Sequence, residues 1–318
     1  MQPIISIVVV AYNVQSYILK CLQSIQNQTV QSMEVLIIND GSTDETAIIC
    51  EEFVQGENRF RLITQENRGL SEARNCGIRE AIGKYIVFVD GADFVEPAMY
   101  EKLLHCTEQQ DADFVLCGYK KYWPDTQRTK NYRISDVILN QSHSTFYFLA
   151  KHNEAHVVTW NKLFLREIII ENELFFENHA FFDDLGFVVR YLSFASKIAI
   201  VDEPLYFNVQ HENLSTKNYY HPIIEQSHEQ TYTQLKQFFH KRKYRNVVEA
   251  FNLRLYIYRY HYILKTSSNS RRLKSIERQM SKASKSFSQL PWKYRMMKPL
   301  IQLRLYPMIF RLIQKVKV

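Results

Sequence analysis

Short apolar runs alternate with amphipathic stretches along the N-terminal third of the chain. Residues 4–10 form a nearly continuous apolar run rich in β-branched side chains, which predicts a strand buried on both faces. Asn13 follows this run and stands where it would cap the next helix. In that predicted helix, apolar residues recur at helical spacing at Val14, Ile18, Leu22 and Ile25.

The strand–helix alternation continues to about residue 118. Predicted strands cover residues 34–39, 59–64, 84–89 and 113–118, and predicted helices begin after Asp44, at Ser71 and at Pro97. Such alternation gives right-handed crossovers and an α/β fold with a doubly wound, mostly parallel, Rossmann-like sheet. Ligands of these sheets bind at the carboxyl ends of the strands, so functional side chains are expected there.

The pattern changes beyond residue 120. Helices are predicted near residues 142–151 and 183–195, short strands near 198–208, and only helices from Ile223 onward. We therefore predict an α/β domain over residues 1–215 and a helical C-terminal extension over residues 216–318.

Charge is unevenly distributed between these regions. The 318-residue chain has a net charge of +7. From Arg271 to the end there are thirteen Lys or Arg residues and one acidic residue, Glu277, so this part carries +12. The preceding 270 residues hold 27 basic and 32 acidic side chains, a net charge of −5. A basic tail on an acidic body predicts that the tail alone contacts an anionic surface.

Composition and motifs disfavour several classes of protein. Five widely spaced cysteines without a CxxC pair indicate neither a disulfide framework nor a zinc site, and they fit a reducing cytoplasm. The first residues lack the basic region of a signal peptide, and no stretch has the roughly 18 apolar residues of a membrane span. No nucleic-acid-binding module is visible, and the first strand–helix turn lacks the GxGxxG of nicotinamide dehydrogenases. A cytoplasmic protein that does not bind nucleic acid is expected.

Carboxylates follow two of the predicted strands. Asp40 ends the second strand and Asp90 ends the fourth. A carboxylate at such a position can accept hydrogen bonds from a nucleotide base or ribose, or can bind a divalent cation. The alternative for Asp40 and Asp44 is helix capping, because Asp-Gly-Ser-Thr-Asp before a helix is good capping chemistry.

These carboxylates belong to a series of motifs that extends over roughly residues 3–215. In chain order the motifs are Ser6–Asn13, Glu34–Asp44, Asn67–Ile78, Gly83–Asp90, Trp160–Phe164 and Phe181–Phe187. In this series the chain resembles the family 2 glycosyltransferases, which have the GT-A fold. The resemblance implies an inverting enzyme that moves a sugar from a nucleotide-sugar, in particular a UDP-sugar, to an acceptor hydroxyl.

The resemblance also implies where the nucleotide would bind. Ala11, Tyr12 and Asn13 would border the nucleotide, and Asp40 would contact uracil or ribose. Arg74 would lie near the diphosphate or order the sugar pocket. The alternative for Arg74 is an ion pair with a surface acid on an amphipathic helix.

The acidic motif after the fourth strand departs from the family pattern. The family usually has Asp-x-Asp followed by a further Asp, whereas this chain has Asp90-Gly91-Ala92-Asp93. Asp90 would bind ribose and metal, but the methyl group of Ala92 cannot ligate Mg²⁺ or Mn²⁺. Three explanations are open. The first is that Asp93 reaches the metal, with His211 as a further ligand or a hydrogen-bond donor to the diphosphate. The second is that Arg or Lys neutralises the diphosphate without metal. The third is that the chain is catalytically disabled.

A second acidic pair, Asp183-Asp184, supplies the candidate base. By the family pattern Asp184 would take the proton from the acceptor hydroxyl, and Asp183 is the acid before it. Nearby aromatic residues, Phe181, Phe182 and Phe187, would lower the local polarity. The alternative is that both aspartates are first-turn acids favoured by the helix dipole.

The end of the chain has the pattern of a membrane-interface helix. Arg304, Arg311 and Lys315 fall on one helical stripe, and the remaining surface is largely apolar. Such a helix would hold the protein at the inner face of the plasma membrane, where a lipid-linked acceptor is met. The alternative is a helix packed on the catalytic domain or on a second copy of the chain in a homo-oligomer.

Two functions from different classes are therefore open. The first is an enzyme of bacterial surface glycan synthesis, acting on a surface polysaccharide, a teichoic acid or a lipid-linked oligosaccharide. The second is a non-catalytic relative that binds nucleotide or glycan and serves as a scaffold. Ala92 supports the second hypothesis, and the intact Asp184 counts against it.

Overall fold

The computed structural model describes residues 2–134, 158–177, 183–210, 222–239, 248–249, 252–253, 255–257, 259–261, 263–264, 270–282, 299–300 and 305–306. These residues fall into two compact units, one up to residue 210 and one from residue 222. Several sequence predictions lie outside the described residues: the helix near 142–151, the aromatic pair Phe181 and Phe182, His211, and the stripe Arg304, Arg311 and Lys315.

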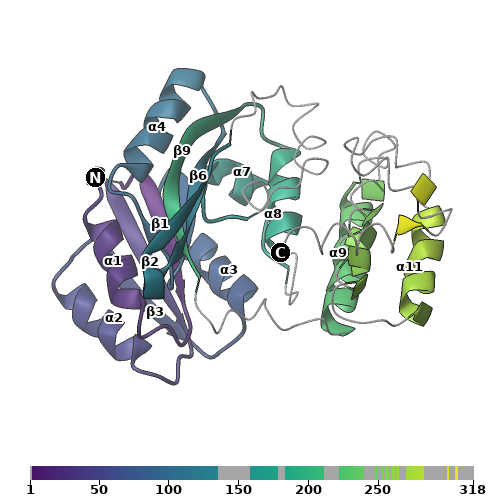
Figure 1. Ribbon diagram of the computed structural model, residues 1–318. Helices are drawn as coiled ribbons and strands as arrows, with labels where there is room; N and C mark the ends of the chain where they lie inside the picture. Colours follow the sequence, from purple (N-terminus) through teal and green to yellow (C-terminus); the bar gives the residue numbers. More distant parts are fainter. Residues whose placement is uncertain are drawn as a thin grey trace. The chain divides into compact units, whose positions relative to one another are not determined.

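A mixed β-sheet forms the centre of the first unit (Figure 1). Within the described residues it has nine strands in the order β3-β2-β1-β4-β8-β6-β9-β5, and β7 pairs with β6. The strands are β1 (Ile5–Ala11), β2 (Met33–Asp40), β3 (Phe60–Gln65), β4 (Tyr85–Asp90), β5 (Phe94–Val95), β6 (Phe114–Trp123), β7 (Arg128–Tyr132), β8 (Lys162–Leu165) and β9 (Ile198–Val209).

The N-terminal half of the sheet is parallel, as the sequence predicts. β1 pairs in parallel with β2 and β4, and β2 pairs in parallel with β3. β1 is buried along its whole length, because helices cover both faces of the sheet. In the other half β8 runs antiparallel between β4 and β6, while β6 and β9 are parallel. The predicted α/β fold class is confirmed.

Helices cover the sheet in two layers (Figure 1). One face carries α1 (Ile18–Gln26), α2 (Thr46–Gln55) and α4 (Met99–Gln110), and the other carries α3 (Leu70–Glu80), α7 (Arg166–Glu171) and α8 (Asp183–Leu192). Gly77 lets α3 approach β1, because a Cβ at that position would lie 2.2 Å from a Cγ atom of Val8.

The loops after β1 and β2 are tied together at the carboxyl edge of the sheet. Asn13 has a φ of 50°, and its Oδ1 accepts a 2.8 Å hydrogen bond from the backbone N–H of Thr43. Since α1 begins only at Ile18, the prediction that Asn13 caps this helix is wrong. Asp44 does serve a helix start, because its Oδ1 accepts a 3.0 Å bond from the N–H of Thr46, the first residue of α2.

An aromatic cluster fixes the position of α8. Phe187 stacks on Phe176 with ring centroids 4.1 Å apart and meets Phe88 of β4 edge to face at 5.9 Å. Aromatic pairs in these arrangements contribute beyond the area that they bury. The cluster therefore holds the N-terminus of α8 over the end of β4.

The described residues of the second unit are helical apart from Phe239 and Leu305, in agreement with the sequence. It contains α9 (Pro222–Phe238) and α11 (Ser270–Lys282). Its core includes Leu253, Ile257, Tyr260, Ile276 and Met280. The opposite side of α11 exposes Arg271, Lys274 and Arg278, so this helix is amphipathic with a basic face. Among the described residues we find no helix with the length and apolar character that a bilayer crossing requires.

Candidate active site

A buried arginine organises the carboxyl edge of the sheet. Arg74 of α3 is 1% exposed, and its Nη1 donates hydrogen bonds to Asp184 Oδ1 at 2.6 Å and Asp183 Oδ2 at 3.4 Å. Its Nη2 donates to Asp90 Oδ1 at 3.1 Å. Residues from α3, β4 and α8 thus meet at one guanidinium, whose planar fork suits several carboxylates at once.

Two hydroxyls complete the contacts of the acidic pair. Ser71, one turn before Arg74, donates from Oγ to Asp183 Oδ2 at 2.9 Å. Thr159 donates from Oγ1 to Asp184 Oδ1 at 3.0 Å. Both donors to Asp184 therefore reach the same oxygen. No described group donates to Asp184 Oδ2, and the side chain keeps 20% of its surface exposed.

The charges of this cluster do not balance. Within the described residues, three carboxylates surround one guanidinium. Burial raises the pKa of Asp184 to about 7; Arg74 opposes the rise, and the neighbouring charges of Asp183 and Asp90 add to it. The same carboxylates raise the pKa of Arg74 against the effect of its own burial, so Arg74 stays charged. The excess negative charge makes one proton on the cluster near neutral pH the physically consistent state.

A buried lysine lies behind the acidic pair. Lys162 of β8 is 0% exposed, and its Nζ donates to Asn161 Oδ1 at 2.6 Å. Burial lowers the pKa of Lys162 to about 7, although the charge of Asp184 acts in the opposite direction. The sequence motif contained this residue, but a Lys between Asn161 and Leu163 at the start of a strand gave no sign of full burial.

Asp93, which the sequence predicts as a metal ligand, accepts hydrogen bonds on both of its oxygens. Its Oδ1 accepts from the N–H of Val209 at 2.8 Å, and its Oδ2 accepts from the Tyr206 hydroxyl at 2.7 Å and from Asn208 Nδ2 at 3.3 Å. Burial and then the charge of Asp90 raise its pKa to about 8, against the effect of these hydrogen bonds. Asp93 thus fastens the turn that contains the acidic motif, residues 90–93 and called the acidic turn below, to β9.

The described residues do not form a metal site on their own. They contain no group of three or more His, Cys, Asp or Glu side chains placed to hold an ion. Asp90 offers a partly exposed carboxylate, Ala92 offers no ligand atom, and both Asp93 oxygens accept hydrogen bonds. Since Mg²⁺ and Mn²⁺ favour several oxygen ligands, the part of the chain described here does not fit such an ion without further ligands.

The residues predicted to border a nucleotide lie at the ends of β1 and β2. Ala11 is buried, whereas the Tyr12 side chain is 45% exposed at the end of β1. Asp40 is buried and accepts three hydrogen bonds: from Gln65 Nε2 at 2.7 Å and from the backbone N–H groups of Arg68 and Gly69, both at 2.9 Å. Asp40 therefore anchors the loop before α3, and its contact with a nucleotide stays a prediction.

The structure brings Arg74 and Asp90 together with the pair Asp183 and Asp184, which follows Arg74 by more than a hundred residues. It places Asp93 against β9 and leaves His211 outside the described residues. Sequence reasoning missed Ser71 and Thr159. The helical spacing between Ser71 and Arg74 was a usable signal for the first, whereas no local pattern marked the second.

The mixed sheet between two helical layers, with a carboxylate cluster at its carboxyl edge, agrees with the GT-A fold that the sequence resemblance implies. The family model described as glycosyl transferase family 2 matches residues 6–172. The chain therefore belongs to glycosyl transferase family 2, and the predicted family and enzyme class are confirmed.

Relatives from bacteria agree with this family. The putative glycosyltransferase EpsH of Bacillus subtilis is 34% identical over 226 residues, which cover 70% of this chain and 65% of EpsH. The glycosyltransferase GlyG of Streptococcus pneumoniae is 33% identical over 217 residues, covering 65% of this chain and 70% of GlyG. The match thus spans slightly less than two thirds of the length of EpsH.

Solved structures share the fold at low sequence identity. S. aureus TarS in complex with UDP-GlcNAc has a TM-score of 0.70 and 15% identity, covering 98% of this chain and 91% of the TarS chain. The mannosyltransferase PcManGT from Pyrobaculum calidifontis, in complex with GDP-Man and Mn²⁺, has a TM-score of 0.52 and 14% identity, covering 98% and 88%. At these identities the likeness concerns the fold alone.

Proposed function

We propose that this protein is an inverting glycosyltransferase that moves a sugar from a UDP-sugar to a hydroxyl of a bacterial surface glycan, with Asp184 as the base. The observation that carries the proposal is that, among the described residues, no donor reaches Asp184 Oδ2. Arg74 and Thr159 hold Oδ1, while Oδ2 receives no described donor and belongs to a partly exposed carboxylate. A base needs an unoccupied oxygen within reach of the proton that it takes.

The surroundings of Asp184 suit this role. In the transfer, the acceptor oxygen forms its bond to the anomeric carbon while the bond to the diphosphate breaks, and the hydroxyl proton passes to Asp184 Oδ2. A pKa of about 7 leaves a substantial ionised fraction at neutral pH and makes the carboxylate a better proton acceptor than an ordinary aspartate. Arg74 fixes the orientation of the carboxylate, because its guanidinium is buried and paired on two sides.

The donor class is supported by the relatives of known structure. TarS is seen with UDP and with UDP-GlcNAc, and PcManGT with GDP-Man and Mn²⁺. We carry over a nucleotide-sugar donor and a divalent cation, Mn²⁺ or Mg²⁺, as proposals for this chain. Asp90 and His211 would contribute ligands to that ion, which would neutralise charge on the leaving diphosphate. The proton transfer to Asp184 does not depend on this ion.

Calorimetric titration with UDP, GDP and CDP, each with Mn²⁺ and then with EDTA, tests the donor site. UDP-selective binding that Mn²⁺ strengthens is the expected result. UDP binding that is indifferent to Mn²⁺ would remove the cation from the proposal and retain the donor. Absence of binding to all three nucleotides would overturn the proposal in favour of the non-catalytic scaffold that Ala92 suggests.

The C-terminal region supports a second part of the proposal. We infer a catalytic domain over residues 1–215 and a basic helical region over residues 216–318 that contacts the cytoplasmic face of the membrane, where a lipid-linked or polymeric glycan acceptor is met. The exposed basic face of α11, with Arg271, Lys274 and Arg278, suits anionic lipid head groups. Vesicle sedimentation with and without anionic lipid tests this contact, and equal binding to both vesicles would contradict it.

A further inference from the structure

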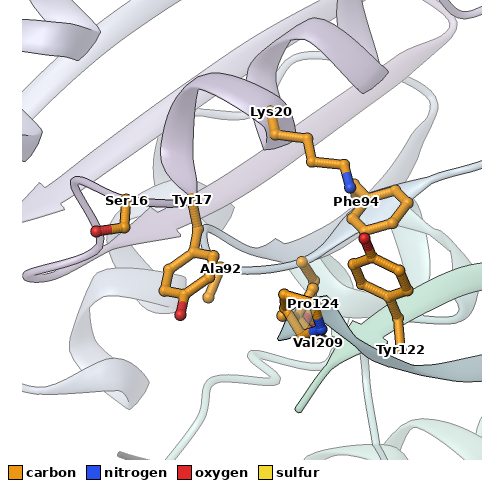
Figure 2. Close-up of a pocket in the computed structure, with 9 residues that line it drawn as sticks. Ser16, Tyr17, Lys20, Ala92, Phe94, Tyr122, Pro124 and Val209 are labelled. Carbon is orange, nitrogen blue, oxygen red and sulfur yellow. Dashed lines mark hydrogen bonds between the residues drawn. The ribbon is translucent and has the colours of Figure 1, made fainter. Parts of the chain in front are cut away.

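A pocket of about 170 Å³ lies beside the acidic turn, on the side of the sheet that α1 covers (Figure 2). Ser16, Tyr17 and Lys20 come from α1 and the turn that leads into it, while Ala92 and Phe94 come from the segment after β4. Tyr122, Pro124, Asp93 and Val209 complete the lining. Arg74 and Asp184 belong to α3 and α8, which cover the opposite face, so this pocket is separate from the candidate base.

Lys20 carries the positive charge of this pocket. Figure 2 shows its ammonium above the Phe94 ring, 3.7 Å from the centroid, and the ammonium lies 4.6 Å from the centroid of Tyr122. Among the described residues no carboxylate forms an ion pair with it, and no acceptor hydrogen-bonds to it. Lys20 as a whole is exposed, and the partial burial of its ammonium against these rings lowers its pKa from the ordinary value.

A second lysine in the same ring stack provides an internal comparison. Phe94 stacks on Phe207 with centroids 4.2 Å apart, and the ammonium of Lys120 lies 4.4 Å from the Phe207 centroid. Lys120 forms an ion pair with Glu96. The stack therefore has a cation at each end, and a described carboxylate neutralises only the Lys120 end. Aromatic faces attract a cation but do not cancel its charge, so the Lys20 end retains the capacity to bind an anion.

We propose that the Lys20 pocket binds a phosphate group of a substrate. Lys20 would supply the charge, the hydroxyl of Ser16 would supply a further donor, and Ala92 leaves room where a carboxylate would repel an anion. The inference rests on the proposed transferase function and extends it. The phosphate belongs either to the donor diphosphate or to a phosphate-containing acceptor, because both present the same group at the edge of the acidic turn.

The test measures binding of inorganic phosphate, uridine and UDP by calorimetry, in EDTA, to the whole chain and to Lys20→Gln. The matched control is Lys120→Gln, which removes the same charge from the other end of the stack. Loss of one charge-assisted contact should weaken phosphate binding about tenfold or more in Lys20→Gln and leave it unchanged in Lys120→Gln. Ala92→Asp should weaken it too, because the new carboxylate would pair with Lys20.

The two sources are separated by UDP. If Lys20→Gln weakens the binding of UDP but not that of uridine, the phosphate is that of the donor. If Lys20→Gln weakens the binding of inorganic phosphate and leaves the binding of UDP unchanged, the pocket serves the acceptor. Equal phosphate binding by the unaltered chain and Lys20→Gln would overturn the inference, as would no phosphate binding by the unaltered chain. Sugar transfer is not the readout, so failure of the proposed function would be recognised separately, by absent UDP-sugar turnover.

Discussion

Two aspartates at the carboxyl edge of the sheet, the buried Asp93 and the partly buried Asp184, have raised pKa values with the same main cause, yet their surroundings differ. Burial raises the pKa of Asp184 to about 7 and that of Asp93 to about 8. Asp93 accepts from three donors of β9, which use both of its oxygens. Asp184 accepts from two donors on one oxygen and leaves the other without a described partner.

The difference shows why a perturbed pKa does not by itself identify a catalytic group. Burial, with a further contribution from neighbouring carboxylates, brings the pKa of either carboxyl close to neutral pH. What distinguishes Asp184 is an acceptor oxygen without a donor among the described residues and an adjacent cation that fixes its orientation. Asp93 has the same titration range, but its hydrogen bonds hold two segments of the fold together. We therefore expect substitution of Asp184 to affect turnover, and substitution of Asp93 to affect stability.

The largest effect should come from Asp184→Asn. The amide can still accept from Arg74 and Thr159 through Oδ1, but it cannot take a proton from the acceptor, so the transfer rate should fall by about 10²- to 10⁴-fold. Initial rates of UDP-sugar turnover with an acceptor would measure this. Asp183→Asn is the matched control, since it changes the neighbouring carboxylate of the same helix, and we expect a smaller loss. A rate within about tenfold of the unaltered enzyme would exclude Asp184 as the base.

A smaller effect, on stability, should come from Arg74→Met. Removing the cation leaves the carboxylates of Asp90, Asp183 and Asp184 close together and partly buried, which should cost about 3–5 kcal/mol of unfolding free energy. Urea denaturation would measure it. The control is Arg79→Met on the same helix, whose ion pair with Glu72 is exposed and should contribute about 0–1 kcal/mol. Equal losses in the two variants would show that the Arg74 cluster is not the stabilising centre that its burial indicates.

The fold could be predicted because its signals are local. The apolar run of β1, the helical spacing on α1 and the strand-ending carboxylates each lie within one element. The exceptions are instructive. Asn13 failed as a cap because its side chain binds Thr43, a residue thirty positions away, and the strands β5 and β8 form through pairing with distant partners.

The candidate site was predictable in its members but not in their contacts. The motifs indicated Arg74, Asp90, Asp183 and Asp184, yet that all three carboxylates share one guanidinium depends on how α3 and α8 pack. The burial of Asp93 against β9 is likewise a long-range property. Lys20 lies on the exposed side of a predicted helix, and its contacts with the rings of Phe94 and Tyr122 depend on the positions of β5 and β6.

The smallest effect should come from Asp93→Asn. At neutral pH the buried carboxyl is largely protonated, and the Asn side chain has nearly the same shape. We therefore expect the free energy of unfolding to fall by about 1–2 kcal/mol, because the amide pairs imperfectly with Tyr206 and Asn208. The informative quantity is the pH dependence of stability. The pKa of Asp93 is raised in the folded protein, from an ordinary value of 3.8 to about 8, so the native state retains a proton that the unfolded chain releases.

The stability that this proton contributes is therefore fully present below about pH 4 and is lost as the pH rises to about 8, with a slope of about 1.4 kcal/mol per pH unit between these limits. Asp93→Asn cannot lose a proton and should lack this contribution. Urea midpoints measured across that range should thus fall less steeply for the variant than for the unaltered protein. Asp184 contributes a slope of the same sign to both proteins, so the difference between the two curves isolates Asp93. Parallel curves would mean that Asp93 is ionised in the fold, and that its hydrogen bonds from β9 outweigh its burial.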